Sequence, residues 1–137
     1  MDEQQKEEER QKQINEKKAT INLNISTNKI QINNLESTKK RYQVLENKVR
    51  SLQEILNSAR KEMLNVTNRL NTAYSSQEVN NKKSSLLAKA QQISKMSSEL
   101  TNTVLPAIKK KIYKIEEEIS KIQSLISKLQ NEYDSLR

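Results

Sequence analysis

The side chains that could do chemistry in this 137-residue chain are carboxylates and lysines, because the sequence contains no histidine and no cysteine. Without imidazoles or thiols there is no histidine base, no thiol nucleophile and no standard zinc ligand set. Glycine is absent as well, which removes the glycine-rich loops that cradle phosphates and the tight elbow that carries a catalytic serine. The remaining candidates for a site are clusters of charge.

The densest acidic cluster is residues 116–118, three glutamates that follow the three lysines of residues 109–111. Successive residues of a helix point in different directions, so these carboxylates do not converge on a metal ion. A catalytic pair of carboxylates needs a pocket that desolvates it, and nothing here suggests one. At helical spacing the two clusters form outer-face ion pairs worth a few tenths of a kcal/mol each. We therefore expect no enzyme activity, no metal and no cofactor.

A basic run, residues 39–41, precedes an apolar repeat that begins near Leu45, as in a basic-region leucine zipper. A helix that reads DNA needs dense phosphate neutralisation along its length. Here Glu36 interrupts the basic residues, and Arg50 stands where a leucine of the zipper is expected. We expect no nucleic-acid partner. The net charge of +8 permits an acidic partner without requiring one.

The composition, with 33% hydrophobic and 31% charged residues, is too polar for an ordinary globular core, so the fold depends on periodicity. From Tyr42 onward the apolar residues alternate steps of three and four, which is typical of a helix whose seam, the row of positions facing another helix, follows a heptad. One seam position holds Tyr42, Val49, Leu56, Met63 and Leu70, and the other holds Leu45, Leu52, Ala59, Val66 and Ala73. Before Tyr42, Ile25 and Ile32 are out of phase, so we expect the seam to drift there.

The last third of the chain has the most regular repeat. Its seam positions hold Leu105, Ile112, Ile119, Ile126 and Tyr133, interleaved with Ile108, Ile115, Ile122, Leu129 and Leu136. Upstream the phase differs, and residues 100–108 contain a slip of the repeat that includes Pro106. Proline removes a hydrogen bond and disfavours helix at the preceding residue, so we expect a kink near Pro106, or a break with Thr103 capping a new helix.

Between the two repeats, the segment Tyr74, Ser75, Ser76 has few apolar neighbours, and Ser75 precedes Glu78 at capping-box spacing. This pattern predicts a turn and two long helices, residues 10–74 and 75–137, after an acidic frayed start at residues 1–9. The predicted fold is all-α, a long antiparallel helical hairpin of the coiled-coil kind, with Ile14 opposite Leu136. One unbroken helix in a parallel oligomer is the alternative, since no glycine or proline forces the turn.

Two further patterns suggest contacts with another chain. Apolar residues off the seam form a second, partial stripe, which favours an assembly of three or four helices, by self-association or with another protein. These residues are Leu23, Ile30, Ile55, Leu64 and Leu125. The small and polar stretch 89–103, with Ser94, Ser98 and Thr101 at seam positions, either fixes the helix register or is a docking surface for another chain.

In architecture the chain resembles the small α-helical proteins related to the WXG family, and more narrowly the helical partners of LXG toxins of the Gram-positive type VII secretion system. Tyr74, Ser75 and Ser76 stand where the family has its Trp-x-Gly turn, and export motifs of the Tyr-x-x-x-acid kind occur at Tyr42, Tyr74 and Tyr113. The resemblance implies a non-catalytic adaptor that binds the helical domain of a toxin through its seams and helps its export.

A self-assembling structural coiled coil, such as a tether, filament or phage scaffold, is the alternative function, so a homo-oligomer stays open. No apolar run is long enough for a membrane span or a signal peptide. We therefore expect a protein that stays in the cytoplasm or leaves the cell without a Sec signal.

Overall fold

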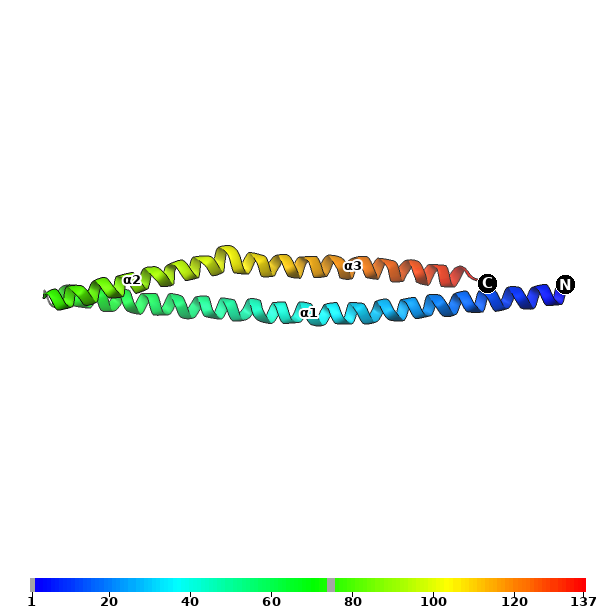
Figure 1. The fold of residues 1–137 in the computed structure, drawn as a ribbon, viewed down its shortest axis with the longest axis horizontal. Coiled ribbons are helices and arrows are strands. Elements are labelled where there is room, and N and C mark those ends of the chain that lie inside the picture. Colours follow the sequence, from blue (N-terminus) through cyan, green and yellow to red (C-terminus); the bar gives the residue numbers. More distant parts are fainter. Residues whose placement is uncertain (1, 74–75) are drawn as a thin grey trace. The chain divides into compact units, whose positions relative to one another are not determined.

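The computed structural model describes residues 2–73 and 76–137, with side-chain surroundings for all of these except 71–73. Its regular elements are α1 (Glu3–Ala73), α2 (Gln77–Glu99), the π-helical turn η1 (Leu100–Val104) and α3 (Leu105–Ser135). No strand occurs within these residues. The prediction of an all-α antiparallel helical hairpin is confirmed, and the alternative of one unbroken helix is wrong (Figure 1).

The chain divides into two units, each of which pairs a segment of α1 with a segment from the second half of the sequence. The terminal unit consists of Met1–Arg41 and Ile112–Arg137, and the turn unit is Tyr42–Lys111. In the terminal unit α1 lies antiparallel to α3, and in the turn unit it lies antiparallel to α2 (Figure 1).

The inward face of α1 follows an unbroken heptad. Its buried or half-buried residues recur in alternating steps of four and three, as expected for a helix that packs along one neighbour. Ile21 and Ile25 are 6% and 7% exposed, and Asn28 and Ile32 are half-buried. The predicted drift of the seam before Tyr42 is therefore wrong. Ile25 and Ile32 mark a second seam position, which lies four residues after the first.

In the turn unit this second seam position is polar. It holds Glu46, Gln53 and Arg60, which are half-buried, and Thr67, which is 4% exposed. Three of the residues predicted for the second seam position lie outside the seam instead: Leu45 and Leu52 are each 44% exposed, and Val66 is 42% exposed. Several inward side chains of α2 are small, namely Ala90, Ser94 and Ser97, although Leu86 and Ile93 are also half-buried. Small residues leave room for long polar side chains whose stems pack while their polar ends reach partners or solvent.

One cross-helix hydrogen bond fixes the pairing of α1 with the π-helical turn. The Gln53 amide donates to the Thr101 hydroxyl at 2.6 Å, and that hydroxyl donates to the Ser97 carbonyl at 3.1 Å. Near the chain ends, Gln13 and Leu136 line one hollow, in agreement with the predicted approach of Ile14 to Leu136. Both contacts require antiparallel pairing.

The second arm of the chain, residues 105–136, has the most apolar seam. Leu105, Ile108, Ile115, Ile119 and Ile122 are buried, with 5% to 9% of their surface exposed. The other seam positions of this repeat are half-buried, namely Ile112, Ile126, Leu129, Tyr133 and Leu136. Continuous isoleucine and leucine on one face exclude water along the whole of α3, and this is the main stabilising contribution of the arm.

The slip of the repeat at residues 100–108 is absorbed by η1. The Leu105 amide donates to the Leu100 carbonyl five residues back, and Leu105 itself is α-helical, with φ −60° and ψ −45°. The predicted break with Thr103 as a cap is wrong, because the helix passes through. A π-helical turn accommodates one extra residue, and it widens the backbone in front of Pro106, whose ring would clash with the carbonyl four residues back in a regular α-helix.

Side chains cap both N-termini. At the start of α1, Asp2 and Gln5 form a reciprocal capping box. The backbone N–H of Gln5 donates to the Asp2 carboxylate at 2.7 Å, and the backbone N–H of Asp2 donates to the side-chain carbonyl of Gln5 at 3.2 Å. At the start of α2, Ser76 is the N-cap, and its hydroxyl accepts from the Val79 amide at 3.2 Å. Glu78 lies in the first turn of α2, where a negative charge is favourable. Tyr74 and Ser75, the other predicted turn residues, lie outside the described residues.

Replacing Ser76 by Ala should lower the free energy of unfolding by about 1 kcal/mol, because the Val79 amide loses its acceptor. Urea unfolding followed by circular dichroism measures this loss. Ser84→Ala is the matched control, since Ser84 is an exposed residue inside α2 and alanine is a good helix former. Equal stability of the Ser76 variant and the wild type would show that the cap is unimportant.

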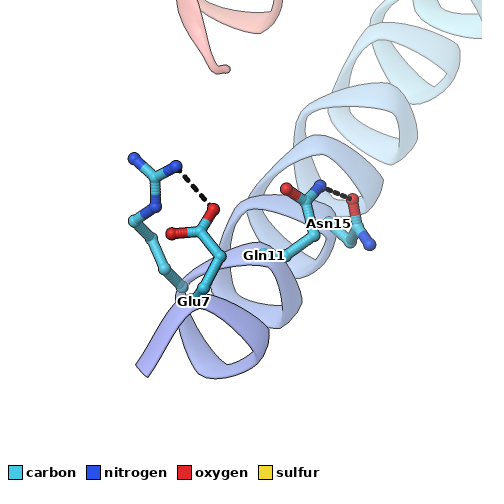
Figure 2. Close-up of polar contacts among 4 residues, drawn as sticks. Glu7, Gln11 and Asn15 are labelled. Atoms are coloured by element: carbon cyan, nitrogen blue, oxygen red, sulfur yellow. Dashed lines mark hydrogen bonds and ion pairs between the residues drawn. The ribbon is translucent and has the colours of Figure 1, made fainter. Parts of the chain in front are cut away.

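The first turns of α1 are held by contacts along their own surface. Arg10 donates to Glu7 at 2.7 Å and Gln11 donates to Asn15 at 3.2 Å (Figure 2). Glu7 raises the pKa of the exposed Arg10 guanidinium through its hydrogen bond and its charge. Residues 2–13 are all exposed. The acidic segment is thus helical from Glu3 and packs against no other part of the described chain.

Candidate functional site

The charged clusters do not assemble a chemical site. Glu116 lies 3.7 Å from Lys39 of α1, which also lies 3.8 Å from Glu36. Glu117 lies beside Tyr113 and raises the pKa of that phenol by a hydrogen bond and by its charge. Among residues 2–73 and 76–137, no group of three or more acidic side chains is placed to hold a metal ion. The three neighbouring glutamates thus face different surroundings, as a helix requires.

Net charge is concentrated in one unit. The turn unit contains twelve Lys and Arg residues and five Glu residues, a net charge of +7. The terminal unit contains thirteen basic and twelve acidic residues, a net charge of +1. A surface with such an excess of one sign attracts partners of the opposite sign and repels copies of itself. An acidic partner therefore has its counterpart in the turn unit.

The turn unit also carries apolar side chains that its own helices leave uncovered. Leu45, Leu52 and Val66 fall one heptad or two apart on α1, and Ala59 shares their heptad position. Ile55, which is 64% exposed, lies one turn from Leu52 and from Ala59. We name the four exposed residues the exposed stripe: Leu45, Leu52, Ile55 and Val66. Ala59 itself is half-buried.

Two features make the exposed stripe a shaped surface. Small residues beside it, Ser58 and Ala59, leave a shallow hollow next to Ile55, into which a side chain of another helix fits as a knob into a hole. Glu54 and Glu62 also line this hollow. The stripe is also confined to the turn unit. The same heptad position in the terminal unit holds Lys17, Asn24, Gln31 and Thr38, all polar. An apolar row with one adjoining hollow suits a single docked helix.

On the other side of the seam, Arg60 lies between two hollows. One has a volume of about 260 Å³ and is polar, lined by Asn57, Arg60, Ser94, Ser97 and Ser98. The other has a volume of about 210 Å³ and is lined partly by apolar residues, with Arg60, Leu64, Leu87, Ala90, Gln91 and Ser94 around it. We name the two together the Arg60 groove. It runs between α1 and α2.

Most of the residues predicted to bind a partner are used inside the chain. Val49 is buried, and Leu56, Met63 and Leu70 are half-buried on the inward face of α1. The buried or half-buried residues of the second arm, from Leu105 to Leu129, likewise pack against α1. Only Leu45 and Leu52 of the predicted set are largely free to contact another protein, and for these two residues the assignment to the seam was wrong.

Two features were missed by sequence reasoning. Ile55 was recognised as lying off the seam, but the exposure of Val66 and the inward position of Arg60 were not expected. A signal for both was present, since counting by sevens from Ile25 and Ile32 leads to Glu46, Gln53, Arg60 and Thr67. Continuing the phase of the N-terminal isoleucines, rather than restarting it at Tyr42, places these polar residues inside and leaves the leucines outside.

Comparison with known proteins adds no relative: no protein-family model, no curated protein and no solved structure matches the chain. No helix in the described part of the chain is long and apolar enough to cross a lipid bilayer. The geometry of the two faces of the turn unit is therefore the basis for assigning a function.

Proposed function

We propose that the protein is a non-catalytic helical adaptor whose turn unit binds an amphipathic helix of another protein. The exposed stripe carries this proposal, because it is an apolar row at heptad spacing that the helices of the turn unit leave uncovered. A helix laid along the stripe buries the leucine, isoleucine and valine side chains. Each such side chain contributes about 1.5–3 kcal/mol when fully buried.

The resemblance to the helical partners of LXG toxins supplies the specific partner in this proposal. It is the helical N-terminal domain of a secreted toxin, which the adaptor binds and helps present to the type VII secretion machinery. In such a complex the two helices of the turn unit and one or two helices of the toxin form a three- or four-helix assembly, with the exposed stripe as its second seam.

Charge favours a different protein over a second copy as the occupant of the stripe. Two turn units that associated would bring together units that each carry a net charge of +7, and repulsion between like charges is unfavourable. The self-assembling coiled coil therefore ranks second, and it is distinguished by solution size. A scaffold forms a discrete homo-oligomer alone, whereas an adaptor forms a stable complex only with its partner.

Co-expression with the helical domain of an LXG toxin encoded beside this protein tests the proposal. We expect a discrete complex by size-exclusion chromatography with light scattering. Leu52→Gln should weaken it about tenfold or more, which corresponds to 1.4 kcal/mol of lost apolar contact.

Leu23→Gln is the matched control, because Leu23 is 67% exposed but lies in the terminal unit outside the stripe. It should leave the affinity unchanged. Equal effects of the two substitutions would contradict the stripe as the binding surface. A discrete homo-oligomer that ignores the toxin domain would favour the structural coiled coil instead.

A further inference from the structure

Arg60 differs from the other charged residues of the α1 seam in having neither an ion pair nor a ring contact within the described residues. Lys39 lies close to Glu36 and Glu116, and Glu46 lies 3.8 Å from Arg50. Lys18 lies over the ring of Tyr133, 5.2 Å from its centre. Within the described residues, no carboxylate lies within ion-pair distance of the half-buried Arg60.

The polar hollow beside Arg60 is lined by groups that can donate hydrogen bonds to an anion. Besides the guanidinium, the polar hollow is lined by the amide of Asn57 and the hydroxyls of Ser94, Ser97 and Ser98. These groups all offer N–H or O–H donors, and no acidic side chain lines the hollow. A carboxylate that enters it meets a guanidinium fork able to donate two parallel hydrogen bonds, which is the strongest common form of a charge-assisted pair.

The second hollow of the Arg60 groove is partly apolar, so a ligand that fills the whole groove needs an apolar group as well as a carboxylate. Leu64, Leu87 and Ala90 line the second hollow, and Leu87 is 42% exposed. Leu64 follows Arg60 by four residues, which is about 6 Å along a helix axis. A helix laid in the groove has the same spacing between side chains at positions i and i+4. An apolar residue and an acidic residue one turn apart would therefore fill both hollows at once.

From this geometry we infer that the Arg60 groove is a second binding face, which takes an acidic protein helix with an apolar side chain one turn from a Glu or Asp. The carboxylate pairs with Arg60 in the polar hollow, and the apolar side chain contacts Leu64 and Leu87. A nucleic acid could place a phosphate in the polar hollow, but its sugar-phosphate backbone has no apolar side chain to fill the adjoining hollow. A protein helix therefore suits the groove better than a nucleic acid. The groove lies across the seam from the exposed stripe, so this site goes beyond the proposed function.

The probes for this inference are two designed amphipathic helical peptides with leucine on one face. One, the acidic peptide, has Glu beside the leucine face, and the other, the neutral peptide, has Gln at the same positions. Fluorescence anisotropy with the full chain should give an affinity for the acidic peptide that is about tenfold higher or more, and the preference should fall with added salt. Arg60→Gln should abolish the preference.

Three variants keep the test specific. Lys61→Gln removes one positive charge from the next residue, which is exposed, and should retain most of the preference. Leu52→Gln damages the exposed stripe and should also retain it. Ser97→Glu supplies an internal carboxylate to Arg60 and should abolish the preference as Arg60→Gln does, without removing the arginine from the seam.

Equal binding of the acidic and neutral peptides to the wild type would overturn the inference. So would an equal loss in Lys61→Gln and Arg60→Gln, because general charge would then explain the preference. Arg60-dependent binding of a single-stranded oligonucleotide that is tighter than peptide binding would assign the groove to nucleic acid instead. Arg60-dependent peptide binding without any toxin complex would support this inference while contradicting the proposed function, so the two failures are distinguishable.

Discussion

Replacing Val49 by Asp should lower the free energy of unfolding by at least about 3 kcal/mol, whereas the same substitution at Leu52 should lower it by about 1 kcal/mol or less. Val49 is 8% exposed on the inward face of α1, and Leu52, three residues later, is 44% exposed. At Val49 the substitution removes buried apolar contacts and introduces a polar group that must be desolvated. At Leu52 a new carboxylate stays in contact with water.

Urea unfolding monitored by circular dichroism gives both free energies, and the comparison is internal because the substituted residues are neighbours on one helix. The outcome distinguishes two alignments of the seam. If Val49 and Leu52 both faced inward, as the apolar repeat from Tyr42 predicts, both variants would lose similar stability. If Val49 and Gln53 face inward, as in the structure, only the Val49 variant is strongly destabilised.

A disulfide between positions 53 and 101 should form in preference to one between positions 52 and 101. If it forms without strain, it should raise the free energy of unfolding by about 4 kcal/mol, the value expected for closing a loop of about 50 residues. In the wild type the Gln53 amide and the Thr101 hydroxyl are 2.6 Å apart, so these two side chains meet across the helices. The chain has no cysteine of its own. The double variant Gln53→Cys with Thr101→Cys therefore has a single possible intramolecular pair.

Mobility on a non-reducing gel measures formation of the cross-link, and urea unfolding with and without reductant measures its contribution. Leu52→Cys with Thr101→Cys is the control pair, because Leu52 points away from the seam and should cross-link poorly. Intermolecular products from the first pair, with no intramolecular bond, would contradict the hairpin. Equal cross-linking of both pairs would contradict the register.

Much of the fold could be predicted from periodicity. In the second arm, the ten seam residues from Leu105 to Leu136 are predicted from spacing, and each is buried or half-buried. One apolar stripe of this kind has no competitor on its helix, so its inward orientation follows directly from the hydrophobic effect. The antiparallel turn near Ser76 was predicted from a polar gap and a capping serine, which are local signals.

Local signals at Pro106 did not decide between a kink and a break. A proline lowers the stability of a regular α-helix at the preceding turn, so either outcome is expected. The chain has no break there, because it inserts a π-helical turn at Leu100–Val104 and stays helical. The packing of α2 and α3 against α1 favours the π-helical turn. The turn accommodates the slip of the repeat, so that the seams before and after it both face α1.

The sequence alone determined that the chain is helical and that α3 packs through its isoleucines, because these features depend on the spacing of residues within one helix. It favoured one reversal near Ser76, and the structure decided between this reversal and an unbroken helix. It did not decide which face of α1 in the turn unit lies inward. Either of two rows of α1 could face inward there: one contains Leu45 and Leu52, and the other contains Glu46, Gln53 and Arg60. The choice depends on the small side chains of α2, such as Ala90, Ser94 and Ser97, which come next to α1 only when the hairpin forms. That tertiary contact leaves the leucines exposed and places Arg60 in its groove, and so it creates both faces to which we assign binding.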